Sequence, residues 1–135
     1  MPEEKTILLI DDDHDVLRGT SARLRRAGFE TVAVDNGVSG VLKAKEDKPD
    51  AILLDARMPL LDGFEALKEL RHQDETHKIP VVMLSACPSL QREALDAGAR
   101  FFLAKPYDGE HLIAAVNAAI EETATNEGGT ADAHA

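Results

Sequence analysis

The sequence predicts an α/β protein built on a doubly wound, five-stranded parallel sheet. Short apolar runs of strand length alternate five times with helical patterns along the 135 residues. The first, third and fourth runs are almost continuously apolar, which is typical of parallel strands that are buried on both faces. The length suits one domain with a single core, and right-handed crossovers leave few possible topologies.

The first two strand–helix units occupy residues 6–50. Strands are expected at 6–10 (TILLI) and 29–34 (FETVAV), the first helix is expected to be capped by Asp13 and to end at Gly28, and Pro49 ends the second connection. The residues at helical spacing, expected to face inward, are Val16, Leu17, Thr20 and Leu24 in the first helix and Val38, Val41 and Leu42 in the second.

The last three units follow the same pattern. Strands are expected at 51–55, 79–85 and 100–105, with helices at 62–73 (capped by Asp62), 88–99 (closed by Gly98) and 107–122 (capped by Asp108). Their expected inward residues are Phe64, Leu67 and Leu70, then Leu90, Ala94 and Leu95, then Leu112, Val116, Ala119 and Ile120. Residues 123–135 are small, polar and unpatterned, so the domain is expected to span 1–122 with a disordered polar tail at 123–135.

Composition narrows the possible partners. The formal net charge is −10, which disfavours nucleic-acid binding because that requires Lys and Arg to replace counterions. No apolar run approaches the length of a membrane span, and the N-terminus lacks the basic and apolar regions of a secretion signal. The single cysteine, Cys87, cannot form an internal disulfide. We therefore expect a cytoplasmic protein without membrane contact.

Polar residues follow the strands where sites form in open α/β sheets, at the carboxyl ends. The first strand is followed by Asp11, Asp12, Asp13 and Asp15, the second by Asp35 and Asn36, and the last three end in Asp55, Ser85 and Lys105. Each residue alone has an ordinary explanation: an aspartate can cap a helix, a serine can sit in a turn, and a lysine can extend to solvent. Those explanations do not account for Asp55 standing beside the others at one edge.

Neighbouring carboxylates need compensation, because each close pair repels by about 4 kcal/mol at the effective dielectric of a protein surface. Asp11, Asp12 and Asp55 carry three negative charges, which Lys105 and a divalent cation would balance. Oxygen ligands completed by water suit Mg²⁺. A Ca²⁺-binding EF-hand loop starting at Asp11 is excluded, because Val16 and Ala22 stand where that loop needs Gly and Glu.

These residue types also fit phosphoryl transfer. A carboxylate can act as a nucleophile and form an aspartyl-phosphate. Mg²⁺, Lys105 and the Ser85 hydroxyl could stabilise the phosphoryl oxygens. Asp55 is the best candidate nucleophile, since it ends the central strand between the acidic pair and the Ser/Lys pair.

Together the motifs resemble the receiver domain of bacterial two-component response regulators, stand-alone members of the CheY type included. The resemblance covers about residues 5–122 and rests on four features in the family's order: Asp11-Asp12, the D-x-x-M-P-x-x-D-G run from Asp55 to Gly63, Ser85-Ala86, and Lys105-Pro106. It implies the flavodoxin-like (βα)₅ fold with strand order 2-1-3-4-5.

The resemblance also implies residue roles. Asp55 is the phosphoacceptor; Asp12, Asp55 and the backbone carbonyl of Arg57 bind Mg²⁺ directly, and Asp11 does so largely through water. Ser85 and Lys105 bind the phosphoryl group. Phe102 is the aromatic switch residue, although tyrosine is commoner there, and Tyr107 stands where phenylalanine is frequent.

The function implied is a phosphorylation-dependent switch, not an enzyme. The phosphoryl group would come from a sensor histidine kinase or phosphotransfer protein, and the partner-binding surface would lie within Pro88–Glu122. We expect no output domain after residue 122, and therefore contact with an unknown downstream protein or onward phosphotransfer, by a monomer or a phosphorylation-linked dimer.

Three alternatives are weaker. An aspartate-nucleophile phosphatase would need a second acid where Arg57 stands, and a flavin binder would need a Ser/Thr/Gly-rich loop after the first strand. A receiver-like module whose partner ignores phosphorylation remains open.

Overall fold

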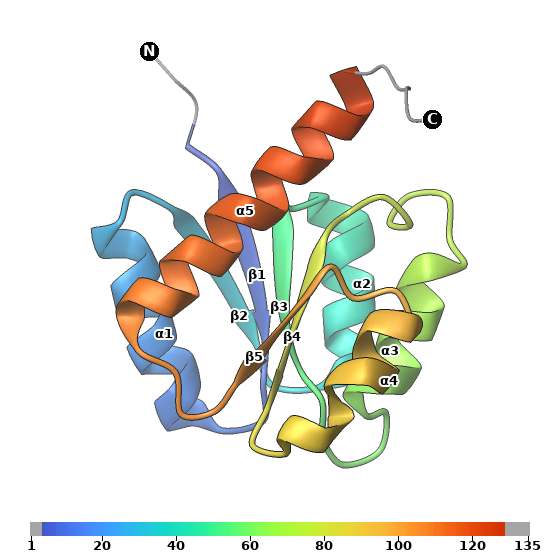
Figure 1. Cartoon of the computed structure of the whole chain (residues 1–135). Coiled ribbons are helices and arrows are strands. Elements are labelled where there is room, and N and C mark those ends of the chain that lie inside the picture. Colours follow the sequence, from blue (N-terminus) through green and yellow to red (C-terminus); the bar gives the residue numbers. More distant parts are fainter. Residues whose placement is uncertain (1–3, 129–135) are drawn as a thin grey trace.

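The predicted parallel sheet is present with the implied strand order. The computed structural model describes residues 4–128, with side chains described up to residue 122. Its five strands run parallel in the order β2-β1-β3-β4-β5 (Figure 1). They are β1 (Thr6–Ile10), β2 (Glu30–Val34), β3 (Ala51–Asp55), β4 (Val81–Ser85) and β5 (Phe101–Ala104).

Helices cover both faces of the sheet (Figure 1). They are α1 (His14–Arg26), α2 (Gly37–Asp47), α3 (Gly63–Arg71), α4 (Gln91–Asp96), which follows a 3₁₀ turn at Pro88–Leu90, and α5 (Gly109–Gly128). Because strand side chains alternate between faces, the core has two parts. One packs Leu9, Leu53 and Val82 against α1 and α5, and the other packs Ile10, Leu54 and Met83 against α2, α3 and α4.

The three predicted aspartate caps are confirmed. Asp13 accepts the backbone N–H groups of Asp15 and Val16 at the start of α1. Asp62 and Glu65 form a reciprocal capping box at α3. The Asp108 Oδ1 accepts the His111 N–H at 2.8 Å at the start of α5. Side chains thus satisfy backbone donors that helix starts leave unpaired.

The predicted inner face of α2 is wrong at two positions. Val38 is 56% and Leu42 is 55% exposed. Val41 is buried as predicted, and the other buried residues of α2 are small: Gly37, Gly40 and Ala44. At Gly40 an added Cβ would lie 2.5 Å from the Ile10 Cδ1, so α2 approaches the sheet too closely for larger side chains. Leu95, expected to face inward from α4, is also 39% exposed.

The last helix extends beyond its predicted end at residue 122 and continues to Gly128. The stretch from Glu122 to the helix end contains no proline, and its first glycine is Gly128 itself. Residues 123–128, expected as the first part of the polar tail, thus lie within the bounds of α5. The remainder of that tail, 129–135, lies outside the described residues.

A half-buried arginine ties two connections together at the amino end of the sheet. The Arg71 guanidinium donates to four backbone carbonyl oxygens, those of Gly98, Thr76, His77 and Ile79, at 2.8–3.4 Å. The α3–β4 and α4–β5 connections are thus held by one side chain.

Candidate functional site

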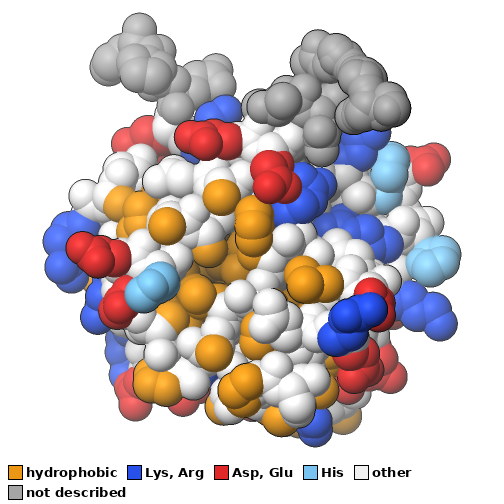
Figure 2. Space-filling model, in the orientation of Figure 1, with side chains coloured by type: hydrophobic (Ala, Val, Ile, Leu, Met, Phe, Trp, Pro, Cys, Tyr) orange, Lys and Arg blue, Asp and Glu red, His pale blue; other side chains and the backbone are white. Residues whose placement is uncertain are grey.

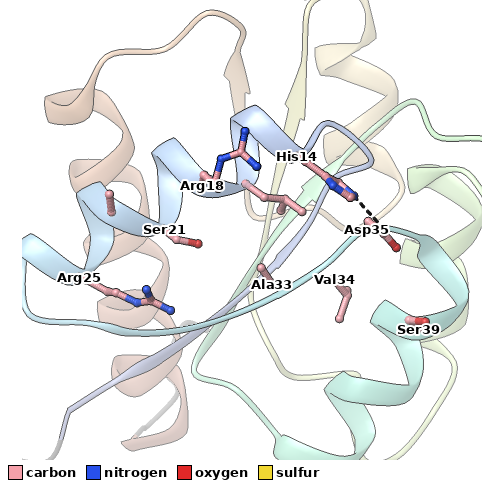
Figure 3. Close-up of a pocket in the computed structure, with 10 residues that line it drawn as sticks. His14, Arg18, Ser21, Arg25, Ala33, Val34, Asp35 and Ser39 are labelled. Atoms are coloured by element: carbon pink, nitrogen blue, oxygen red, sulfur yellow. Dashed lines mark hydrogen bonds and ion pairs between the residues drawn. The ribbon is translucent and has the colours of Figure 1, made fainter.

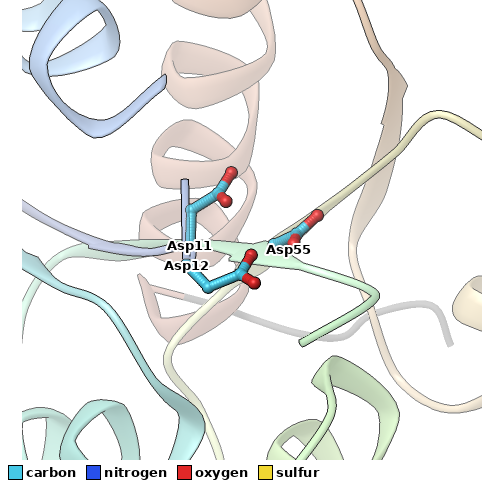
Figure 4. A group of neighbouring side chains, drawn as sticks. All are labelled: Asp11, Asp12 and Asp55. Carbon is cyan, nitrogen blue, oxygen red and sulfur yellow. The ribbon is translucent and has the colours of Figure 1, made fainter. Parts of the chain in front are cut away.

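The carboxyl ends of four strands bring the predicted site residues to one edge of the sheet. Asp55 and Ser85 are the last residues of β3 and β4, while Asp11 and Lys105 directly follow β1 and β5. Figure 4 shows the side chains of Asp11, Asp12 and Asp55 gathered at this edge. Carboxylate oxygens of these three residues lie within 4.8 Å of one another.

Lys105 links two of the carboxylates. Its Nζ lies 2.9 Å from the Asp11 Oδ2 and 3.0 Å from the Asp55 Oδ1. Asp11 and Asp55 are only 2% and 5% exposed, while Asp12 faces solvent. One ammonium therefore meets two buried carboxylates, and the three carboxylates together leave a net negative charge beside it.

The charges at this edge shift two pKa values. Burial raises the pKa of Asp55 to about 6, and the charges of Asp11 and Asp12 add to that shift, while the hydrogen bond and charge of Lys105 oppose it. Burial disfavours the Lys105 ammonium, but the hydrogen bonds to Asp11 and Asp55 and the negative charges of these two residues together outweigh burial and raise the pKa of Lys105. At neutral pH, Asp55 is therefore mostly ionised and Lys105 is charged.

The carboxylate group fits a hard divalent cation. It offers oxygen ligands from a buried and an exposed position, with open solvent on the Asp12 side from which waters could complete the coordination. Asp11 is less available: its Oδ1 accepts the Asp13 N–H at 3.0 Å and its Oδ2 accepts from Lys105. Asp12 and Asp55 are thus the better direct ligands.

The loop after β3 is packed tightly beneath Asp55. The Gly63 N–H donates to the Ala56 carbonyl at 3.0 Å. A Cβ at Gly63 would lie 2.2 Å from the Asp55 backbone oxygen. The sequence indicated Gly63 only through a motif; the structure shows that its missing side chain lets α3 start against the end of β3.

The other predicted site residues lie around this centre. Ser85 is 2% exposed, and its Oγ accepts the Cys87 N–H at 3.0 Å. The Arg57 side chain is exposed, so any role at the site falls to its backbone. Phe102 is half-buried beside Met83, its partner in the β4–β5 register, two residues before the pairing of Ser85 with Ala104.

The residues after β2 do not join the cluster. The Asp35 Oδ2 lies 3.0 Å from the His14 Nε2, and both side chains are exposed. They line a separate groove of about 770 Å³ between α1 and β2 (Figure 3). Asn36 instead caps α2 by accepting the Ser39 N–H at 2.8 Å.

Comparison with known proteins places this geometry in a family. The family described as "Response regulator receiver domain" matches residues 7–117. The chain belongs to the response-regulator receiver family. Members are signalling switches that take a phosphoryl group on an aspartate from histidine kinases or phosphotransfer proteins and bind Mg²⁺ in their active site.

Curated relatives of this receiver domain are bacterial. The chain is 39% identical over 129 residues to the transcriptional regulatory protein PrrA of Mycobacterium tuberculosis, covering 92% of the chain and 54% of PrrA. It is 37% identical over 119 residues to the DNA-binding transcriptional regulator RpaA of Synechocystis, covering 87% of the chain and 49% of RpaA. The chain thus spans about half the length of these relatives. Protein PilH of Pseudomonas aeruginosa is 34% identical, with 84% of the chain and 96% of PilH covered.

Solved receiver structures share the whole fold. The receiver domain of the sensor histidine kinase PA1611 from Pseudomonas aeruginosa, which holds a magnesium ion in its active-site cleft, superposes with a TM-score of 0.81 at 31% identity, covering 88% of this chain and 99% of that one. Chemotaxis protein CheY4 of Vibrio cholerae gives a TM-score of 0.81 at 28% identity, covering 87% and 99%. No helix in the described part of this receiver is both long and apolar enough to cross a bilayer.

Proposed function

We propose that this receiver domain accepts a phosphoryl group on Asp55, with Mg²⁺, from a histidine kinase or a phosphotransfer protein. The observation that carries the proposal is Lys105, which bridges Asp11 and Asp55 at 2.9 and 3.0 Å beside the exposed Asp12. An ionised acceptor, a fixed cation and further carboxylates are the parts that phosphoryl transfer to a carboxylate requires.

The transfer would be a displacement at phosphorus. An Asp55 carboxylate oxygen forms the new bond to phosphorus, while the bond to the donor's imidazole nitrogen breaks and its electron pair leaves with the imidazole. The Lys105 ammonium, which pairs with the free carboxylate, would then pair with a phosphoryl oxygen, and the Ser85 hydroxyl would donate a hydrogen bond to one of the phosphoryl oxygens.

Asp12, Asp55 and the backbone carbonyl of Arg57 would hold Mg²⁺ directly, and Asp11 would act through water. Both Asp11 oxygens already accept hydrogen bonds, which supports the indirect role. When bound, the cation would neutralise phosphoryl oxygens that three carboxylates otherwise repel.

The signal would leave through the face that carries β5 and α5. Hydrophobic side chains gather across the middle of this face, with charged side chains toward its edges (Figure 2). The partly buried hydrophobic residues of β5 and α5 include Phe102, which packs against the core cluster on the α2, α3 and α4 side of the sheet, and Leu103 and Ile113, which pack against the cluster on the α1 and α5 side. Movement of Ser85 toward the phosphoryl group would free space for Phe102 to repack and shift this face toward a partner-binding form.

The output would be contact with a downstream protein or onward phosphotransfer. PilH supports this reading, because nearly the full length of that relative is covered by the match. RpaA and PrrA are transcriptional regulators in which the match covers about half of the protein.

Acetyl phosphate and Mg²⁺ provide the direct test. Intact-mass measurement should show one added phosphoryl group on the wild-type protein and none on Asp55→Asn. Asp74→Asn is the matched control, since Asp74 is an exposed aspartate in the α3–β4 connection, and it should be labelled like the wild type. Full labelling of Asp55→Asn would refute Asp55 as the acceptor.

A further inference from the structure

A hydrogen bond between two hydroxyl groups joins α1 to the segment that carries Lys105. The Thr20 Oγ1 lies 2.8 Å from the Tyr107 hydroxyl oxygen. Thr20 is 5% exposed on the inner face of α1, and Tyr107 is half-buried in the connection from β5 to α5. The ring of Tyr107 packs against the core cluster that contains Leu17 and Leu112.

This contact lies close to the proposed phosphoryl site. Tyr107 follows Lys105 by two residues, with Pro106 between them. The backbone of Lys105 is fixed on one side, where its N–H donates to the Ser85 carbonyl at 2.8 Å. The Tyr107 hydroxyl fixes the other side, just before Asp108 caps α5.

A lysine ammonium on a flexible stem is placed by the backbone that bears it. Lys105 must reach two carboxylates from different strands at once, at 2.9 and 3.0 Å. Small displacements of a charged group are costly in phosphoryl transfer, which depends on positioning and electrostatic stabilisation. The hydrogen bonds that fix the backbone on each side of Lys105 should therefore influence the rate of phosphoryl transfer.

We propose that Tyr107, through its hydroxyl bond to Thr20, is a positioning residue that holds the Lys105 ammonium against Asp11 and Asp55. The inference rests on the proposed phosphorylation of Asp55. Phenylalanine at position 107 would keep the ring packing and lose the hydrogen bond to α1. A change in the phosphorylation rate of that variant would therefore come from the loss of the hydroxyl group.

Four variants isolate the hydrogen bond: Tyr107→Phe, Thr20→Val, the double variant, and Thr20→Ser, which retains a hydroxyl. The rate of phosphorylation by acetyl phosphate and Mg²⁺ is followed by intact mass, at a temperature where thermal unfolding shows every variant folded. Each single loss of a hydroxyl should slow the rate about threefold, the scale of one net hydrogen bond. The double variant should be no slower than either single variant, and Thr20→Ser should return to the wild-type rate.

A spectroscopic readout is independent of the reaction. The chain has one tyrosine and no tryptophan, so its ultraviolet emission comes from Tyr107. Thr20→Val should change that emission, and Thr20→Ser should leave it close to the wild type.

The outcomes separate the two proposals. A wild-type protein that takes no phosphoryl group overturns both. If the wild type is labelled, and Tyr107→Phe and Thr20→Val are phosphorylated as fast as the wild type, the positioning role alone is overturned. The same follows if Thr20→Ser is as slow as Thr20→Val, or if the two losses multiply in the double variant, because packing would then explain the effect.

Discussion

Asp55→Asn should make the folded protein more stable at neutral pH, because the wild-type carboxylate is ionised in an unfavourable place. Burial raises the pKa of Asp55 from 3.8 to about 6. Between these two values the folded protein binds more protons than the unfolded chain, so the free energy of unfolding falls as pH rises through this range. At pH 7 the full loss is expressed, about 3 kcal/mol at 1.36 kcal/mol per pKa unit.

Asparagine removes the charge while keeping the shape. The interaction of the carboxylate with Lys105 is already contained in the pKa of about 6, and Lys105 keeps its partner Asp11 at 2.9 Å in the variant. The gain in the free energy of unfolding should therefore approach about 3 kcal/mol at pH 7, and it should shrink as pH falls below the pKa of Asp55.

Urea unfolding followed by circular dichroism, from pH 4 to 7.5 with a chelator present, measures this gain directly. Asp74→Asn, an exposed control, should follow the wild-type curve within about 0.5 kcal/mol. The reasoning fails if Asp55→Asn is no more stable than the wild type at pH 7 and keeps the same dependence on pH.

Three further predictions use the same unfolding measurement. Gly63→Ala should lower the free energy of unfolding by about 2 kcal/mol and weaken Mg²⁺ binding, because its Cβ would lie 2.2 Å from the Asp55 backbone oxygen. Gly19→Ala, which has open space around its Cβ, should cause no loss of stability. Equal losses in the two variants would contradict the argument from close approach. Arg71→Met should lower the free energy of unfolding by about 2–4 kcal/mol, because it leaves backbone carbonyl groups unpaired. The exposed control Arg92→Met should lower it by about 0.5 kcal/mol. Similar losses in the two variants would count against the anchoring role of Arg71. Mg²⁺ at 100 times its dissociation constant should stabilise the wild type by about 2.7 kcal/mol; an equal gain in Asp55→Asn would argue against Asp55 as a ligand.

Local patterns predicted the elements that depend on local chemistry. Caps such as Asp13 and Asp62 act on backbone groups two or three residues away, so their spacing is visible in the sequence. The number of strands followed from apolar runs, whereas the strand order came from the family resemblance. The site residues could be predicted because parallel strands bring their carboxyl ends to one edge.

The features that the sequence did not reveal depend on contacts between residues far apart in the chain, or on positions that have no side chain. The inner face of α2 is formed partly by glycines, which leave no apolar signal, so the apolar spacing points to the exposed Val38 and Leu42. The bond between Thr20 and Tyr107 joins residues 87 positions apart, and no local spacing encodes such a pair.

The most direct test of the central claim is to locate the phosphoryl group chemically. Borohydride reduces an acyl phosphate to an alcohol and leaves an ordinary carboxylate unchanged, so the modified aspartate acquires a distinct mass. After reaction with acetyl phosphate and Mg²⁺, peptide sequencing by mass spectrometry should find that change at Asp55 alone. A change at another aspartate, or labelled protein that borohydride leaves intact, would contradict phosphorylation of Asp55.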